Sequence, residues 1–406
     1  MEQPPWHHSQ LRPPSHGDSS MTTSSSWLLL DIRAYIDDRR NSTTCFAVLI
    51  QVTFCFAPPP LISYICIWSS TADPVEFFEW PPMVESVNAD LVFIRIRSNK
   101  QHVDDLVYQD MDMDRDVGSY NICIFDSVSC RWNSHPISLD ELKNPPAKEE
   151  VLHLTEKTIY LGGEQLAFVY LWKGILICNE LGNRFTGSYV MLPDGTVKLG
   201  RHRSGMNTRD IAIVDDRLTF VRLRTRYYSD VGWCWDLCTW SKPVARLDEE
   251  DWREDFMLDS CDLLVDEQQT RNIHLLPRLP DHPPMAKLIV AHSTICLTDA
   301  NVIYIMGKVD VSDHRAVVLT INLTTRRLQE VSVFDSRVIN MFDFSYMQST
   351  ISQYFTNAAS GVNENLKRPG VFHAPYPHKQ HVGNKPLQLD VGRGSETQDG
   401  DPMFLE

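Results

Sequence analysis

One short pattern recurs five times along this chain of 406 residues: an apolar run that ends in Trp, Asp or Asn, then a turn, then a second strand-like run. The apolar runs are YICIW (Tyr64–Trp68), YNICIFD (Tyr120–Asp126), GILICN (Gly174–Asn179), WDLCTW (Trp235–Trp240) and VVLTIN (Val317–Asn322). A β-hairpin that returns at long, roughly even intervals is typical of a radial, bladed β-sheet protein. The pattern therefore predicts a fold class and leaves the biochemical activity open.

The spacing of the hairpins sets the expected number of blades. The apolar runs end at residues 68, 126, 179, 240 and 322, so the gaps between them are 58, 53, 61 and 82 residues. Propeller repeats usually run about 40–50 residues, so we expect blades with long loops and room for one more blade in the last gap. We predict an all-β, β-propeller-like domain over residues 26–356 with about six or seven blades. A pair of β-sandwiches would also present short strands at such intervals.

Short runs rich in Val, Ile, Phe, Tyr and Trp predict the individual strands. The predicted strands are Ala47–Phe54, Ile62–Ile67, Asp90–Arg95, Tyr120–Phe125, Lys157–Leu161, Gln165–Tyr170, Gly174–Cys178, Asp210–Ile213, Arg217–Leu223, Trp235–Trp240, Lys287–Ala291, Val302–Met306, Ala316–Ile321 and Leu328–Val333.

Three other segments complete the domain organisation. Ser345–Ala358 has apolar residues at helical spacing, which predicts a short C-terminal amphipathic helix. The acidic segment Asp248–Asp259 fits either a short helix or a loop between blades. The polar ends, residues 1–25 and 357–406, are expected to be a disordered segment and a flexible tail.

Charge and cysteine content restrict the class of partner and the compartment. The formal net charge of −15 argues against nucleic acid and anionic membrane as partners, because the summed field repels phosphate. Most of the ten cysteines lie in apolar runs, for example Cys55, Cys178 and Cys296, so we expect buried, reduced thiols in a reducing compartment. No signal peptide is visible, and the apolar stretch Cys45–Trp68 is interrupted by Gln51 and three prolines. A cytoplasmic and/or nuclear protein without a transmembrane segment is expected.

Catalytic and metal-binding patterns are absent from the sequence. Cys234 and Cys238 stand four apart on a predicted strand, which separates them by roughly 13 Å, too far to share one metal ion. The acidic run Asp110–Asp116 fails the EF-hand pattern, because Arg115 and Asn121 occupy the positions of its Gly and Glu. We therefore predict no catalytic residue, no metal site and no cofactor.

One segment combines cations with aromatic side chains. On a strand, Arg222, Arg224 and Arg226 of RLTFVRLRTR point to the same face. Arg beside aromatic residues is typical of a surface that recognises phosphate, carboxylate or an acidic peptide, although a solvated strand face backed by core aromatics is the alternative. We predict that these three arginines and Trp233 lie near a partner surface. The aromatic residues that follow directly are Tyr227, Tyr228, Trp233 and Trp235.

The order of several strand-and-turn motifs carries a family resemblance. The motifs are WLLLD (Trp27–Asp31), AYIDDRR (Ala34–Arg40), IQVTF (Ile50–Phe54), WKGILICN (Trp172–Asn179) and FSYM (Phe344–Met347). Over roughly residues 27–370 the chain resembles the plant domain-of-unknown-function 1618 (DUF1618) family, which is expanded in grasses. The block from about 171 to 299 resembles the domain that gives the family its name. The resemblance implies no catalytic residues.

A more distant similarity, to the β-propeller domains attached to plant F-box proteins, leaves three hypotheses for function. Residues 1–60 hold no helical F-box pattern. We favour a non-catalytic intracellular protein-interaction module of unknown partner, which binds an acidic surface or peptide through rim loops. The alternatives are a substrate adaptor without its own F-box, which would recruit through Ser345–Ala358 or the tails, and an uncharacterised enzyme with a site at the channel mouth. The oligomeric state stays open.

Overall fold

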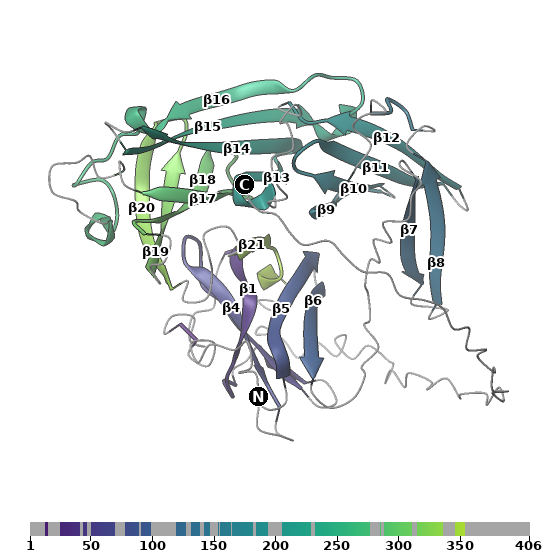
Figure 1. Cartoon of the computed structure of the whole chain (residues 1–406), viewed down its shortest axis with the longest axis horizontal. Helices are drawn as coiled ribbons and strands as arrows, with labels where there is room; N and C mark the ends of the chain where they lie inside the picture. The colour runs from purple at the N-terminus through teal and green to yellow at the C-terminus, as the bar shows by residue number, and fades with distance from the viewer. Residues whose placement is uncertain are drawn as a thin grey trace, which may run out of the picture. The chain divides into compact units, whose positions relative to one another are not determined.

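The computed structural model in Figure 1 describes residues 13–14, 25–40, 44–46, 50–69, 78–88, 91–98, 119–126, 131–138, 142–146, 153, 155–163, 165–181, 184–193, 205–228, 232–276, 285, 288–310, 315–335 and 346–353. All of them fall in one compact unit, residues 1–361, and the second unit, residues 362–406, lies outside the described residues. Of the predicted disordered ends, only Pro13, Pro14 and Ser25 are described. The acidic run Asp110–Asp116 also lies outside the described residues.

Three antiparallel sheets of four strands each follow one another along the chain. The second sheet holds β9 (Lys157–Gly162), β10 (Gln165–Tyr170), β11 (Gly174–Leu181) and β12 (Arg184–Met191). The third holds β13 (Arg209–Val214), β14 (Arg217–Tyr228), β15 (Gly232–Pro243) and β16 (Arg253–Asp259). The fourth holds β17 (Ile289–Ile295), β18 (Val302–Lys308), β19 (Arg315–Asn322) and β20 (Arg327–Asp335).

The first sheet is larger and mixes distant parts of the chain. Its strand order is β2-β3-β4-β1-β5-β6, with β21 paired to β1. These strands are β1 (Leu28–Ile36), β2 (Thr44–Phe46), β3 (Gln51–Cys55), β4 (Ile62–Trp68), β5 (Phe78–Asn88), β6 (Leu91–Ser98) and β21 (Tyr346–Ser349). A separate hairpin joins β7 (Ser119–Asp126) to β8 (Arg131–Ser138).

The all-β, propeller-like fold class is confirmed, because the four larger sheets form a propeller-like ring. The recurring apolar runs mark equivalent strands in three of these sheets: β11, β15 and β19 are each the third strand of four in chain order. Each runs through the interior of its sheet, and Ile175, Leu237 and Leu319 are fully buried there. A strand with neighbours on both edges and packed elements on both faces is buried throughout, so its sequence is a continuous apolar run. This burial explains why the repeated apolar run marks the third strand of each of these sheets.

The predicted blade count is wrong, because the described residues form four such sheets and one two-stranded hairpin. The long gap between residues 240 and 322 holds no further blade in its described part. It holds β16, β17 and β18, and a segment that bridges to β20 at Leu264 and Arg271. β16 occupies Arg253–Asp259, so the second half of the acidic segment is a strand and neither a helix nor a loop.

The predicted C-terminal helix, Ser345–Ala358, is wrong for the first part of that segment. Ser352 and Gln353 are helical, and residues 354–358 lie outside the described residues. Tyr346–Ser349 forms the strand β21, which pairs antiparallel with β1 from Leu28↔Ser349 to Asp31↔Tyr346. Tyr346 is buried against the ring of Phe334, with the ring centroids 6.2 Å apart. The backbone pairing and this burial override the local helical spacing, as tertiary context often does with a weak propensity.

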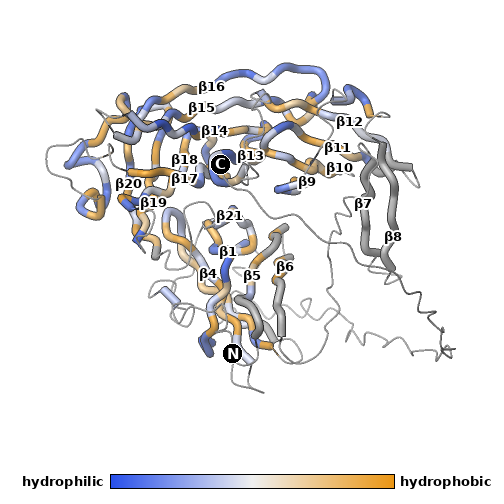
Figure 2. Tube along the Cα trace, viewed as in Figure 1, coloured by the Kyte–Doolittle hydropathy of each residue, from blue (hydrophilic) through white to orange (hydrophobic). Residues whose placement is uncertain are grey.

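Apolar clusters pack successive sheets together, and Figure 2 shows hydrophobic residues gathered on β10, β11, β17 and β18. One cluster contains residues of the second and third sheets, such as Ile177 and Phe220. Another contains residues of the third and fourth sheets, such as Leu237 and Ile305. A further cluster joins the fourth sheet to the first through Trp27. In the described part of the chain, no helix is long and apolar enough to cross a membrane.

A polar network links all four sheets where they meet. We call Lys157 of β9, Asp210 of β13, Gln348 of β21 and the backbone of Ile295 the central polar network. The Lys157 ammonium donates to an Asp210 carboxylate oxygen at 2.8 Å and to the Gln348 side-chain oxygen at 2.6 Å. Asp210 also accepts from the Ile295 backbone N–H at 3.0 Å and from the Gln348 amide at 2.9 Å. Because these residues are far apart in sequence, the network ties the sheets to one another.

Removal of the Asp210 carboxylate should destabilise the whole unit. In Asp210→Ala the Lys157 ammonium loses its counter-charge, and the buried N–H of Ile295 and the Gln348 amide each lose an acceptor. We expect the free energy of unfolding to fall by about 3 kcal/mol, the range seen when a buried ion pair loses one partner. Urea denaturation followed by circular dichroism measures it. Glu249→Ala, at an exposed residue, should change the value by less than about 0.5 kcal/mol.

Asp31 on β1 is a second buried carboxyl, only 2% exposed. It accepts hydrogen bonds from the Arg33 backbone N–H at 2.9 Å and from the Tyr35 hydroxyl at 3.2 Å. Burial outweighs these two bonds and raises the pKa of Asp31 from 3.8 to about 7. The folded protein therefore favours the protonated carboxyl. Its contribution to stability is present below pH 4 and is lost as the pH rises to about 7.

Asp31→Asn should remove this loss of stability. The amide resembles the protonated carboxyl, so we expect the variant to gain up to ~4 kcal/mol over the wild type at pH 8 and little at pH 4, since one pKa unit corresponds to ~1.4 kcal/mol. Denaturation curves between pH 4 and 8 measure the difference. Asp262→Asn, at an exposed carboxyl, should keep the wild-type slope. A wild-type slope in Asp31→Asn would show that Asp31 is ionised throughout.

Candidate functional site

The outer ends of β14 and β15 extend beyond their sheet as a two-stranded ribbon. β13 pairs with β14 only as far as Arg222, and β16 pairs with β15 only as far as Asp236. Beyond these points β14 and β15 pair with each other alone, up to Tyr228↔Gly232. We call residues 224–228 and 232–236 the hairpin arm. The five residues of β14 in this arm are all exposed, whereas the six before them are buried.

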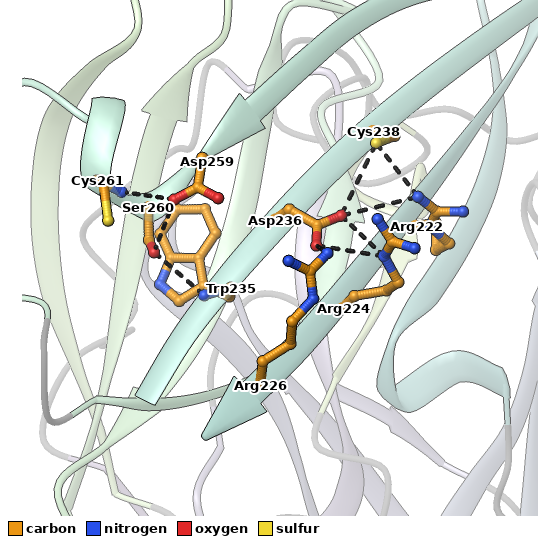
Figure 3. A network of polar contacts seen from close by, with 9 residues as sticks. All are labelled: Arg222, Arg224, Arg226, Trp235, Asp236, Cys238, Asp259, Ser260 and Cys261. Atoms are coloured by element: carbon orange, nitrogen blue, oxygen red, sulfur yellow. Dashed lines mark hydrogen bonds and ion pairs between the residues drawn. The ribbon is translucent and has the colours of Figure 1, made fainter. Parts of the chain in front are cut away.

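The arginines of the arm converge on one buried carboxylate, as Figure 3 shows. Arg224 lies directly opposite Asp236 in the β14–β15 ladder and donates from Nε to both carboxylate oxygens, at 3.0 and 3.2 Å. A terminal nitrogen of Arg226 also donates to Asp236. The side chain of Asp236 is 7% exposed, whereas those of Arg224 and Arg226 are 49% and 45% exposed. The carboxylate thus holds two guanidinium groups at the surface.

Arg222 shares this face of the strand but lies deeper in the sheet. It is 7% exposed, and a terminal nitrogen stands 3.7 Å from Asp236. The same nitrogen donates to the Cys238 sulfur at 3.4 Å, and the guanidinium lies 5.1 Å from the ring centroid of Trp240. Of the three predicted arginines, Arg222 is therefore buried in the sheet, and only Arg224 and Arg226 are open to solvent.

The other face of the arm is aromatic. Tyr227 and Trp233 are directly opposite each other in the ladder, and their rings meet edge to face with centroids 5.3 Å apart. Tyr227 is 65% exposed, which is unusual for a large aromatic side chain. Trp233 is partly buried and lies on the face opposite to the arginines. The structure therefore divides the predicted set between the two faces of one arm.

Tyr228 lies on the same face of β14 as the arginines. A hydrogen bond with Tyr228, then the negative charge of Asp236, raise the pKa of Arg226. Arg226 therefore stays charged at any physiological pH, and the cationic face of the arm keeps its charge. This face can bind a carboxylate or a phosphate, because Arg224 contacts Asp236 through Nε and the guanidinium is half exposed to solvent.

Asp236 was not among the predicted site residues, although the sequence held a signal for it. The β14–β15 ladder ends at the pair Tyr228↔Gly232, and Gly232 has a positive φ of 92° that suits glycine. A hairpin that ends at this pair places Arg224 opposite Asp236, and opposite charges in such positions attract. In the described part of the chain, no group of three or more His, Cys, Asp or Glu side chains is placed to hold a metal ion.

Comparisons with known proteins give a family match for part of the chain and no activity. Residues 169–304 match the family DUF1618, described as a protein of unknown function. The predicted family resemblance is thereby confirmed for this region, which includes the second half of the second sheet, the third sheet and the start of the fourth. Neither the curated proteins nor the solved structures gave a significant match to this chain.

Loss of the Asp236 charge should weaken the third sheet. In Asp236→Asn the buried Arg222 guanidinium no longer has a carboxylate beside it. We expect the free energy of unfolding to fall by about 3 kcal/mol, because an uncompensated charge remains buried. Asp266→Asn is the matched control, since Asp266 also pairs with an arginine but both side chains are more than a third exposed. That change should cost less than about 1 kcal/mol. Equal losses would show that Asp236 acts as an ordinary surface carboxylate.

Proposed function

We propose that this protein is an interaction module whose hairpin arm binds an acidic segment of a partner protein. The exposed guanidinium groups of Arg224 and Arg226, held together by one buried carboxylate, carry the proposal. Arg222, Arg224 and Arg226 face Asp236, and Asp259, paired with Asp236 in the ladder, adds a second negative charge. This face therefore keeps an excess of one positive charge. An acidic ligand would complement that excess.

The arm is suited to binding because its side chains are already positioned. Arg224 is held by two hydrogen bonds and Arg226 by one to the same carboxylate, so little side-chain freedom remains to be lost on association. Tyr227 and Trp233 add an aromatic surface on the reverse face. Arg, Tyr and Trp are the residue types most enriched in the energetically important centres of protein interfaces.

The charge of the whole chain favours a protein ligand over the other anionic partners. A formal net charge of −15 repels nucleic acid and anionic lipid surfaces over long distances. A short acidic segment carries less charge and can reach the arm locally. We place this activity inside the cell, in the cytoplasm or the nucleus.

The two alternative functions receive less support. An adaptor that recruits through Ser345–Ala358 would need that segment to be accessible, yet Tyr346–Ser349 is paired with β1. An enzyme with a site at the channel mouth would need reactive groups there. The side chains that meet between the sheets are Lys157, Asp210 and Gln348, and their polar atoms bond one another. Because these polar atoms already bond one another, a structural role is favoured for the three side chains.

Binding of an acidic peptide should depend on the exposed arginines. The probe is a fluorescein-labelled hexapeptide of alternating Glu and Leu, whose anisotropy is measured with the full chain. In the double variant Arg224→Gln/Arg226→Gln we expect at least about tenfold weaker binding, because two charge-assisted hydrogen bonds are lost. The affinity of the wild type should also fall as the salt concentration rises.

A second pair of exposed arginines provides the matched control: Arg246 lies just after β15, and Arg253 begins β16. Arg246→Gln/Arg253→Gln removes the same charge away from the arm and should bind the peptide like the wild type. A Gln-for-Glu version of the peptide should bind none of these proteins. The proposal fails if the wild type does not bind the acidic peptide, or if both double variants lose affinity equally while remaining folded by circular dichroism.

A further inference from the structure

Two cysteines lie near each other at the edge of the third sheet, Cys234 in the hairpin arm and Cys261 just after β16. The β15–β16 ladder ends at the pair Asp236↔Asp259, and one residue further the Trp235 backbone N–H donates to the Ser260 hydroxyl at 3.1 Å. A second step along both segments reaches Cys234 and Cys261. The Trp235–Ser260 contact therefore places these two cysteines on neighbouring segments, with Cys261 in the short 3-10 helix η6 (Ser260–Asp262), although they are far apart in sequence.

The two side chains are close enough to influence each other. Asp259 first, then burial, and then Cys234 raise the pKa of Cys261. Both cysteines are free thiols, Cys234 is partly exposed and Cys261 is exposed. Asp259 fixes the turn that carries Cys261, because its carboxylate accepts from the Cys261 backbone N–H at 2.9 Å. Figure 3 shows Asp259, Ser260 and Cys261 where the chain leaves β16 beside Trp235.

We propose that Cys234 and Cys261 are a reversible redox site that forms a disulfide with a small disulfide, such as glutathione disulfide, as the oxidant. The thiolate of one cysteine attacks the oxidant, which forms a mixed disulfide and releases one glutathione thiolate. The second cysteine, as its thiolate, then attacks the protein sulfur of the mixed disulfide and releases the other glutathione. In total the two protein thiols lose two protons and two electrons, and one glutathione disulfide becomes two glutathione thiols.

Among the described residues, other neighbouring thiols lack this access. Cys55 and Cys66 lie in the same apolar cluster, but both are buried within the first sheet. Cys238 is buried beside Arg222 and Asp236. The hydrogen bond to Asp259, then burial, raise the pKa of Cys261, so its thiolate is scarce at neutral pH. Exchange should accordingly be faster at mildly alkaline pH, where thiolates are more abundant.

The groups around the pair are mostly acidic. Asp259 is two residues before Cys261 on its own segment, and Asp236 is two residues after Cys234 on β15. Arg226 on β14 is directly opposite Cys234 and supplies the positive charge on that side. The disulfide would join β15 to the segment after β16, and thus the base of the arm to the edge of its sheet. The inference does not depend on the proposed binding function.

The test is peptide mapping of the folded full chain after incubation with glutathione disulfide at mildly alkaline pH. Free thiols are trapped with N-ethylmaleimide, and the chain is cleaved by trypsin without reduction. Residues 227–246 then form one peptide with Cys234 and Cys238, and residues 254–271 form another with Cys261. We expect these two peptides to be joined in most molecules and to separate after reduction.

Single substitutions identify the cysteines involved. The joined peptide should persist in Cys238→Ser and disappear in Cys234→Ser and in Cys261→Ser. In the last two variants, the remaining cysteine should instead carry one glutathione. The proposal is overturned if the wild type shows separate glutathione adducts on the two peptides and no joined peptide. It is also overturned if the joined peptide persists in Cys234→Ser, because Cys238 would then be the partner.

Discussion

The carboxylate of Asp210 is the point on which the arrangement of the four sheets depends. It lies on β13, yet its partners come from β9, β17 and β21, so one side chain satisfies polar groups of all the neighbouring sheets. Apolar clusters supply non-directional attraction between successive sheets, but they do not set a unique angle or register. Hydrogen bonds have defined directions, and leaving a buried donor or acceptor unsatisfied is costly. The central polar network therefore selects one arrangement among those that the apolar clusters permit.

The balance of charge at Asp236 is the opposite of that at Asp210. This difference distinguishes the structural site from the candidate binding site. At Asp210 one ammonium and two neutral partners surround the carboxylate, so charge and hydrogen-bonding capacity are both matched inside the protein. At Asp236 three guanidinium groups share one carboxylate, and two of them remain half exposed. The ion pairs hold Arg224 and Arg226 in place without cancelling their charge. A rigid excess of charge at the surface is what a recognition site for an oppositely charged ligand requires.

The features that could be predicted from the sequence are those set by local pattern. Runs such as Gln165–Tyr170 and Val302–Met306 lie in predicted strands because their apolar composition suits buried strands. β8 and β16 contain many polar and charged residues, so their pairing depends on neighbours distant in sequence. The same applies to β21, which takes its conformation from β1 at the far end of the chain. At the candidate site the alternation of side chains predicted one arginine face, whereas the counter-ion Asp236 and the burial of Arg222 depend on the register of three strands.

The position of the hairpin arm explains how one strand can serve both the core and the surface. Up to Arg222, β14 lies between β13 and β15 and packs its apolar side chains against the adjacent sheets. Beyond that residue it pairs with β15 only, and from Arg224 its side chains are exposed. The buried half, Arg217–Leu223, is anchored by seven paired positions shared with β15, so the exposed half is held in an extended conformation that an isolated hairpin would hold only marginally. Rigidity in the arm thus originates in the core of the third sheet, and a change at the base of the arm, where Asp236 and Asp259 pair, is placed to alter its outer end.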